Sequence, residues 1–197
     1  MSGHGGGWAN PAPAGLVALA VACFTFFAVL CGKVEHTCIP LLGIWLIGGG
    51  IVQLIVGLIE LNEGAVTGGN VFTFFAAFFM FVGAFEFLFK YFAALNGWQI
   101  DARIDGWAWL VLWIALWLWT PAYFKSTLVM TLLLLCLDVA VPLVALRDLG
   151  ILGASASPIA GYFLLLTGIF GLWQAAAIML NTVYGKTVIP TGGPLAK

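Results

Sequence analysis

The chain has 197 residues, of which 63% are hydrophobic and 8% are charged, and its formal net charge is −1. Soluble domains carry about 25% charged residues, so this composition excludes a soluble globular protein. The near-neutral charge also excludes the basic surface that binds nucleic acid. A mean hydropathy of +1.11 indicates an all-α integral membrane protein, because backbone groups in lipid must bond within the protein.

A helix that crosses the hydrocarbon core needs about 20 mainly apolar residues, and six stretches of the chain approach that length. In chain order they cover about residues 13–31, 40–61, 66–91, 106–122, 127–146 and 158–183. We expect one six-helix transmembrane domain over residues 10–186, between a flexible tail at 1–9 and a C-terminal tail at 187–197. Basic residues divide almost evenly between the two sides, so the positive-inside rule does not orient the bundle.

The first span begins with Asn10, Pro11, Ala12 and Pro13. Asparagine caps helix N-termini, and proline at the first helical position presets the backbone without losing a hydrogen bond. A helix N-terminus carries partial positive charge and attracts anions. This segment is therefore either an anion site or only a stiff helix start at the membrane interface.

Several polar residues lie inside apolar spans. Placing an ionisable group there raises the free energy of membrane insertion by a few kcal/mol. Gln53 and Glu60 are seven residues apart and share one helix face; Gln53 either lines a pathway or bridges helices. Glu86 and Lys90 are spaced for an i,i+4 ion pair near the membrane surface. Asp138 has no partner nearby in sequence, and both a functional and a structural role stay open.

The sequence shows no pattern typical of a catalytic, metal-binding or nucleotide-binding site. The four cysteines form no C-x-x-C pair and are expected to be buried, inert thiols. No Ser/His/Asp set, metal cluster or nucleotide loop stands out. We therefore expect no enzyme activity, no metal and no cofactor.

Three motifs, in order, resemble those of the acetate uptake transporter family, the family of the succinate–acetate permeases. They are NPAPAGL at residues 10–16, GGIVQLIVGLIE at residues 49–60 and LNTVYGKTVIPTG at residues 180–192. The resemblance implies six helices per subunit, a homohexamer, and both termini in the cytoplasm. It places the protein in the plasma membrane, the inner membrane if the cell is Gram-negative.

The resemblance also implies passage of small monocarboxylates, chiefly acetate and in some members succinate, along a path within each subunit. By spacing from the motifs, the family's apolar constriction falls on Leu19, Phe75 and Leu135. The expected partners are acetate or a similar carboxylate, the lipid bilayer and further copies of the chain. Ammonium-linked members are also known in this family.

The chain departs from the family pattern in ways that mark a divergent member. Phe75 lacks the hydroxyl of the family's tyrosine, and Glu86 and Asp138 occupy positions expected to be apolar. The family's G-N-x-F motif fits residues 69–72 by letters and residues 64–67 by ungapped spacing; we prefer the ungapped register.

These patterns predict that carboxylate oxygens meet backbone N–H groups at the start of the first helix, while Gln53 supplies a hydrogen bond along the route. The expected substrate-binding residues are Asn10, Pro11, Ala12, Pro13, Ala14, Gly15, Leu16 and Gln53. Glu60 and Asn181 are expected to anchor the motif helices. A proton-coupled carrier needs a titrating group in the path, for which Asp138 or Glu60 is the candidate; a channel needs none. The alternative function is a non-transporting sensor or scaffold, or an ammonium-linked protein of the same fold.

Overall fold

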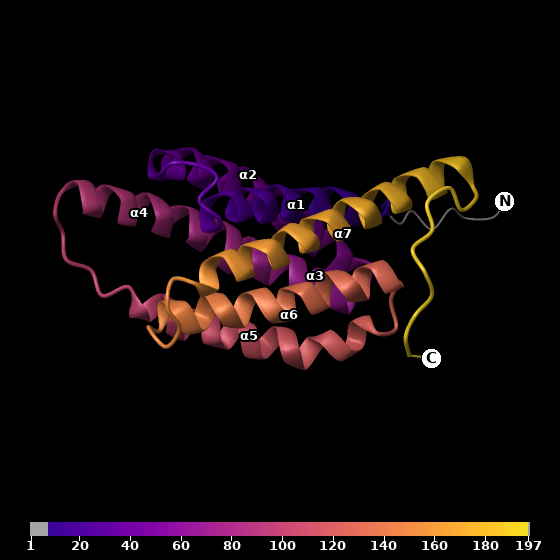
Figure 1. Ribbon diagram of the computed structural model, residues 1–197. Helices are drawn as coiled ribbons and strands as arrows, with labels where there is room; N and C mark the ends of the chain where they lie inside the picture. Colours follow the sequence, from indigo (N-terminus) through magenta and orange to yellow (C-terminus); the bar gives the residue numbers. More distant parts are fainter. Residues whose placement is uncertain (1–7, 197) are drawn as a thin grey trace.

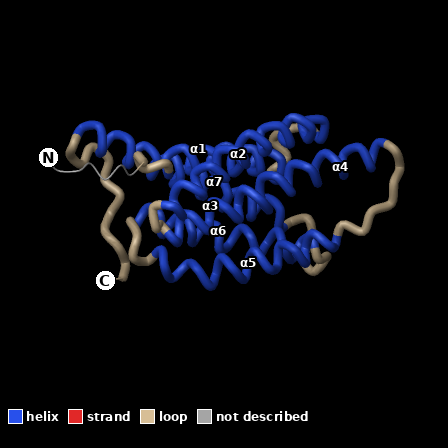
Figure 2. Tube along the Cα trace, turned by 180° about the vertical axis from the view of Figure 1, so that it is seen from behind, coloured by secondary structure: helices blue, strands red, loops and turns tan. Residues whose placement is uncertain are grey.

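The computed structural model describes residues 8–196, so most of the tail expected at 1–9, and Lys197, lie outside the described residues. The described residues form helices, turns and loops without a strand, and the helices run roughly alongside one another in an elongated bundle (Figures 1 and 2). The helices are α1 (Ala12–Leu30), α2 (Ile39–Asn62), α3 (Val66–Phe74), α4 (Gly83–Leu95), α5 (Arg103–Tyr123), α6 (Leu128–Asp148) and α7 (Ala156–Tyr184). A 3-10 turn, His36–Cys38, precedes α2, and the π-helical segment η2 (Phe75–Val82) joins α3 to α4.

Counting the continuous stretch Val66–Leu95 as one, residues 8–196 contain six long helices, as expected. Within the described residues, five are long and apolar enough to cross a membrane: 12–30, 36–62, 66–95, 128–148 and 156–184. The expected fourth span, 106–122, lies in α5, which is not among the five. Tryptophan has a polar N–H, so the five tryptophans of α5 lower its hydropathy. The chain is a multi-pass membrane protein.

Small residues let α1 and α7 approach closely in the middle of the bundle. A Cβ added to Gly168 of α7 would lie 2.8 Å from the Phe24 ring of α1, and one added to Gly171 would lie 3.4 Å from the Leu16 carbonyl oxygen. Membrane helices associate through such backbone approach because lipid supplies no hydrophobic driving force between them. The α1–α7 pair is thus closely packed along the bundle.

The π-helical segment η2 changes which side chains of the third span face α1. Within it, Phe75 and Phe79 are four residues apart and lie on the same side, with ring centroids 5.5 Å apart in an edge-to-face arrangement. Both rings are buried. Short π-helical insertions often occur at functional sites, and this one lies at the centre of the bundle.

A proline in α6 leaves one carbonyl group without its usual helical donor. Pro142 has no N–H, so it cannot bond the carbonyl oxygen of Asp138 one turn earlier. The indole Nε1 of Trp117 in α5 donates to that oxygen at 3.0 Å. Trp117 therefore replaces the missing backbone donor and joins α5 to α6.

Replacing Trp117 with phenylalanine is expected to lower the free energy of unfolding by about 1 kcal/mol, the usual net value of one hydrogen bond. In a Pro142→Ala background, residue 142 supplies its own N–H, so the same Trp117→Phe change is expected to cost less. Thermal unfolding of the four proteins in detergent measures this coupling. Equal costs in both backgrounds would contradict the role assigned to Trp117.

The described part of the C-terminal tail folds back on the bundle. The Asn181 side chain of α7 donates to the Ile189 carbonyl at 2.9 Å and accepts from the Val188 and Ile189 N–H groups at 2.6 and 2.9 Å. The Thr191 carbonyl accepts from the Val129 N–H at the start of α6. Asn181 thus holds the tail across the end of the bundle where α1 begins (Figure 1).

Candidate functional site

Two cavities follow one another along the seam between α1, the third span and α6. The proximal cavity, beside the start of α1, has a volume of about 60 Å³. The distal cavity, beside the end of α1, has a volume of about 440 Å³. Residues from the same three elements line both, so the two cavities lie along one seam of the chain.

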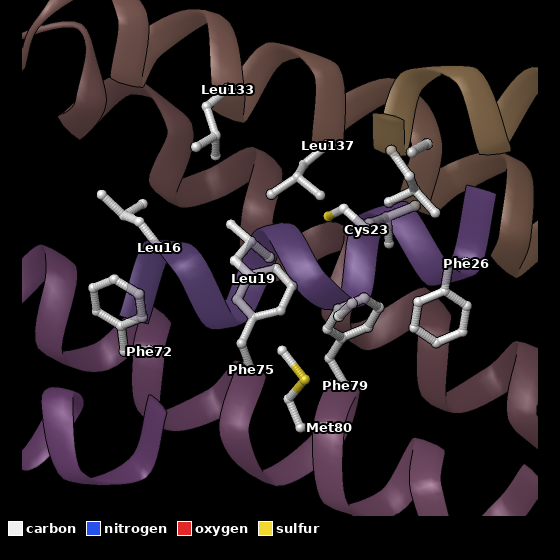
Figure 3. Close-up of a cluster of buried hydrophobic side chains, with 14 of the residues drawn as sticks. Leu16, Leu19, Cys23, Phe26, Phe72, Phe75, Phe79, Met80, Leu133 and Leu137 are labelled. Atoms are coloured by element: carbon white, nitrogen blue, oxygen red, sulfur yellow. The ribbon is translucent and has the colours of Figure 1, made fainter. Parts of the chain in front are cut away.

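Apolar side chains close the seam between the two cavities. We call this group the waist; its members are Leu19, Cys23, Phe75, Phe79 and Leu137, none more than 5% exposed. In Figure 3, Leu19 and Cys23 of α1 lie between the Phe75 and Phe79 rings on one side and Leu137 of α6 on the other. A solute that crosses the subunit along this seam must displace these side chains.

The structure brings two of the three expected constriction residues together and excludes the third. Leu19 and Phe75 both line the proximal cavity. Leu135 is 39% exposed on the outer side of α6, so the expectation for this position is corrected. Leu134 and Leu137 line the cavity in its place, because the helical turn points these two positions inward.

The start of α1 offers no free backbone donor for an anion. The first four N–H groups of a helix lack helical partners, and here those four positions are Pro11, Ala12, Pro13 and Ala14. The two prolines have no N–H. The Ala12 N–H donates to the Asn10 side-chain oxygen at 2.9 Å, and the Ala14 N–H donates to the Pro11 carbonyl at 3.1 Å. Binding of carboxylate oxygens to these groups stays a prediction, and it would require a carboxylate to displace one of these two hydrogen bonds.

The NPAPAGL segment instead shapes the wall of the proximal cavity. Ala12 and Leu16 line it, whereas Asn10 and Ala14 are exposed and Pro13 lies along a different groove, between α1, α2 and α7. Gly15 faces the third span, where an added Cβ would lie 2.6 Å from the Phe72 ring. The missing side chain of Gly15 therefore sets the position of Phe72, which also lines the cavity.

Gln53 of α2 contacts the NPAPAGL segment. Its Nε2 donates to the Gly15 carbonyl at 3.3 Å, and its side chain is 1% exposed. The Oε1 atom of the same amide is buried without a hydrogen-bond partner. Gln53 lines the proximal cavity, so the structure places an unpaired acceptor at the candidate path.

Glu60 also lines the proximal cavity. Its carboxylate packs against Gly68 in the first turn of α3, so closely that a Cβ on Gly68 would meet Oε2. A negative charge is stabilised at a helix N-terminus. Glu60 therefore joins α2 to α3 and leaves an acidic group at this end of the path.

Asp138 lies outside both cavities. It neighbours Leu137 in sequence, but its backbone carbonyl faces Trp117 of α5 and its Oδ1 is buried without a partner. It is absent from the residues that line either cavity. Of the two expected candidates for a titrating group in the path, only Glu60 has the position that this role requires.

Charged side chains surround the distal cavity. Lys90 of α4 bonds to Asp105 of α5 and lies 3.6 Å from Glu86. Arg147 of α6 donates to Asp148 at 2.6 and 2.8 Å and to the Ser157 hydroxyl at 3.2 Å. The expected Glu86–Lys90 pair is therefore part of a larger cluster, whose buried member is Asp105.

Sequence reasoning missed several contributors to the site, among them Cys23 and Leu137 of the waist and Phe72 beside Gly15. Phe79 completes the waist, and Met130 and Tyr123 line the proximal cavity. Tyr123 restores a hydroxyl-bearing side chain to a cavity where Phe75 has none. The four-residue spacing of Phe75 and Phe79 was a signal for a shared face, but no local pattern ties Tyr123 at the end of α5 to residues of α1.

Comparisons with known proteins agree with this architecture. The family model described as the GPR1/FUN34/yaaH family matches residues 5–192. Among solved structures, the chain is similar to one described as the bacterial acetate channel SatP, with a TM-score of 0.81 and 23% sequence identity. The match covers 94% of this chain and 99% of that chain. The comparison with curated protein sequences gives no match.

Proposed function

We infer, because the chain belongs to the GPR1/FUN34/yaaH family, that it is a membrane channel or transporter for acetate and similar small monocarboxylates. The observation that carries this proposal is the pair of cavities separated by the waist within one subunit. An apolar constriction excludes large and strongly hydrated solutes until its side chains part. Passage of succinate is a further part of the proposal, and the 440 Å³ distal cavity is large enough to admit it.

The residues of the path divide into a polar end, an apolar barrier and a charged mouth. At the polar end, Gln53 offers an acceptor and Ala12 and Leu16 form the wall. The waist is the barrier that sets the size limit. The charged residues around the distal cavity form the mouth; they are Glu86, Lys90, Asp105, Arg147 and Asp148. These charged groups keep the distal cavity hydrated.

We also propose that the protein assembles as a homohexamer with both termini in the cytoplasm. An apolar groove of about 960 Å³ runs along α1, α2 and α7 and supports close packing between copies. Six long helices place the start of α1 and the end of α7 at the same end of the bundle (Figure 1). Cross-linking in native membranes measures the subunit number, and protease accessibility of the tail measures the orientation.

Uptake of labelled acetate into vesicles that contain the purified chain tests the proposed function. Uptake above that of protein-free vesicles, with competition by unlabelled short monocarboxylates, is the expected result. No difference from protein-free vesicles would favour the sensor or scaffold function. Transport of ammonium without acetate would favour the ammonium-linked function.

The position of Asp138 predicts that the Asp138→Asn variant keeps the wild-type dependence of acetate uptake on external pH, because this side chain lines neither cavity. The Glu60→Gln variant removes the carboxylate that does line the path, and its pH profile is expected to change. Initial uptake rates across a range of external pH values measure both profiles. A changed profile for Asp138→Asn would return that residue to the mechanism.

A further inference from the structure

The segment that follows α7 is bonded to the part of the bundle that surrounds the proximal cavity. We call residues 187–196 the strap; it leaves the end of α7 and reaches the turn between α5 and α6 (Figure 1). We propose that the strap sets how far the start of α6 can move away from the proximal cavity, and thereby which lengths of monocarboxylic acid enter. This inference rests on the proposed function, because it concerns the solutes of the same path.

The proximal cavity admits a carboxylic acid only when one of its walls moves. Its volume of about 60 Å³ is about twice the volume of one water molecule in the liquid. A carboxylic acid with a hydrocarbon chain is larger than that. The helix that moves most readily therefore controls which acids the cavity accepts.

Close packing holds two walls of the cavity in place. A Cβ added to Gly168 of α7 would lie 2.8 Å from the Phe24 ring of α1, and one added to Gly57 of α2 would lie 2.9 Å from the Thr73 backbone nitrogen in α3. Tightly packed interfaces resist displacement because each group fills the space beside its neighbour. The contact of α7 with α6 is looser, since a Cβ at Gly171 would lie 3.7 Å from Leu133.

The strap bonds to both sides of the turn between α5 and α6. The Val129 N–H in the first turn of α6 donates to the Thr191 carbonyl at 3.1 Å. The Ala196 N–H donates at 2.9 Å to the carbonyl of Phe124, the residue after α5. Groups at helix ends have no helical partner, so the strap supplies partners that the turn lacks. Both bonded residues are next in sequence to residues that line the cavity; these are Tyr123 and Met130.

The strap is in turn bonded to α7. Asn181 donates to Ile189 and accepts from the N–H groups of Val188 and Ile189. The Trp173 indole Nε1 donates to the Pro190 carbonyl at 2.9 Å. Since α7 packs closely on α1, the strap ties the start of α6 to a closely packed part of the bundle. Outward movement of the start of α6 must therefore break strap bonds.

The position of α6 affects both the cavity and the waist. Leu133 and Leu134 of α6 line the cavity, and Leu137 of the same helix also belongs to the waist. A longer acid needs a larger displacement of this helix than acetate does. The strap bonds therefore disfavour entry of longer acids more than entry of acetate, by about fivefold for each hydrogen bond that must break.

The Gly192→Ala variant loosens the strap without changing a residue of the cavity. Gly192 has a φ of +70°, and an added Cβ would lie 2.7 Å from the Leu128 Cβ at the start of α6. Alanine is strained in this backbone conformation, so the substitution displaces the strap from α6. Gly193→Ala is the matched control, because a Cβ at Gly193 meets no atom within 4 Å.

Asn181→Ala loosens the strap from its other side by removing the hydrogen bonds to Val188 and Ile189. Asn181→Asp keeps an oxygen that accepts from both N–H groups and is expected to behave more like the wild type. Asn96→Ala is the control, because the Asn96 side chain donates at 2.7 Å to Phe92 of its own helix, at the opposite end of the bundle. Elution volume and unfolding temperature establish that each full-length variant is folded.

Two measurements follow the strap and its effect separately. Hydrogen exchange of the Val129 amide measures the attachment of the strap to α6 without any transport. We expect exchange about fivefold faster in Gly192→Ala and Asn181→Ala, and wild-type exchange in the two controls. Uptake of labelled acetate and labelled butyrate into vesicles measures the effect on acid length. The ratio of butyrate to acetate uptake is expected to rise about fivefold in the same two variants.

The outcomes separate this proposal from the proposed function. Faster exchange at Val129 with an unchanged uptake ratio overturns the effect on acid length and leaves acetate transport standing. A rise of both uptake rates by the same factor overturns it as well. Wild-type exchange at Val129 in both variants overturns the attachment of the strap to α6. Absence of uptake of either acid by the wild-type chain overturns the proposed function, while exchange at Val129 still reports the attachment.

Discussion

Acetate uptake by a Gly15→Ala variant is expected to fall to less than about a tenth of the wild-type rate. The added Cβ would lie 2.6 Å from Cε1 and 2.9 Å from Cζ of Phe72, closer than atoms in a folded protein approach. Phe72 is 6% exposed and lines a cavity of about 60 Å³. The ring has little room except in that cavity, so its displacement closes the path.

The control for this variant is Gly153→Ala, since a Cβ at Gly153 meets no atom within 4 Å. We expect its uptake rate to equal that of the wild type. A second change, Phe72→Leu in the Gly15→Ala background, provides space for the methyl group and is expected to restore most of the uptake. Wild-type uptake by Gly15→Ala would show that the seam between α1 and the third span is not the path.

The largest expected effect on stability comes from Lys90→Met. This change removes the cation beside Asp105, which is buried at the start of α5, and leaves Glu86 close to it without a counter-charge. Removing one partner of a buried pair is costly because a buried charge remains. Since the Lys90 side chain is 36% exposed, we expect a loss of about 2–3 kcal/mol in the free energy of unfolding, at or below the low end of the values for fully buried pairs.

The matched control is Lys33→Met, because Lys33 is exposed and takes part in none of the ion pairs among residues 8–196. A Lys90→Met/Asp105→Asn double variant removes both charges and is expected to recover most of the lost stability. Thermal unfolding in detergent compares the four proteins. An unfolding temperature for Lys90→Met equal to that of Lys33→Met would show that water, and not Lys90, compensates the Asp105 charge.

The start of α1 shows how far a local prediction can be separated from a chemical one. The helix does begin at this segment, with Pro11 as the N-cap residue, Pro13 in the first turn and Asn10 accepting a hydrogen bond from the Ala12 N–H. The same residues, however, leave no donor for a ligand: the prolines have no N–H, and Asn10 and Pro11 occupy the other two groups. Propensity rules identify where a helix starts, but only the atomic arrangement shows whether its donors remain free.

The sequence by itself determined the class of protein and the number and approximate bounds of the long helices, because the bilayer demands long apolar stretches. It also determined the family, because the three motifs are specific. Only the tertiary structure decided which faces meet. Leu134 and Leu137 enter the seam while Leu135 does not, and Asp138 faces α5 rather than a cavity. A helix in lipid is apolar on every side, so the periodicity that marks the buried face of a soluble helix is missing. The inward face then follows from packing between helices: small residues set the close approaches, and Gly15 and Gln53 help to shape the proximal cavity.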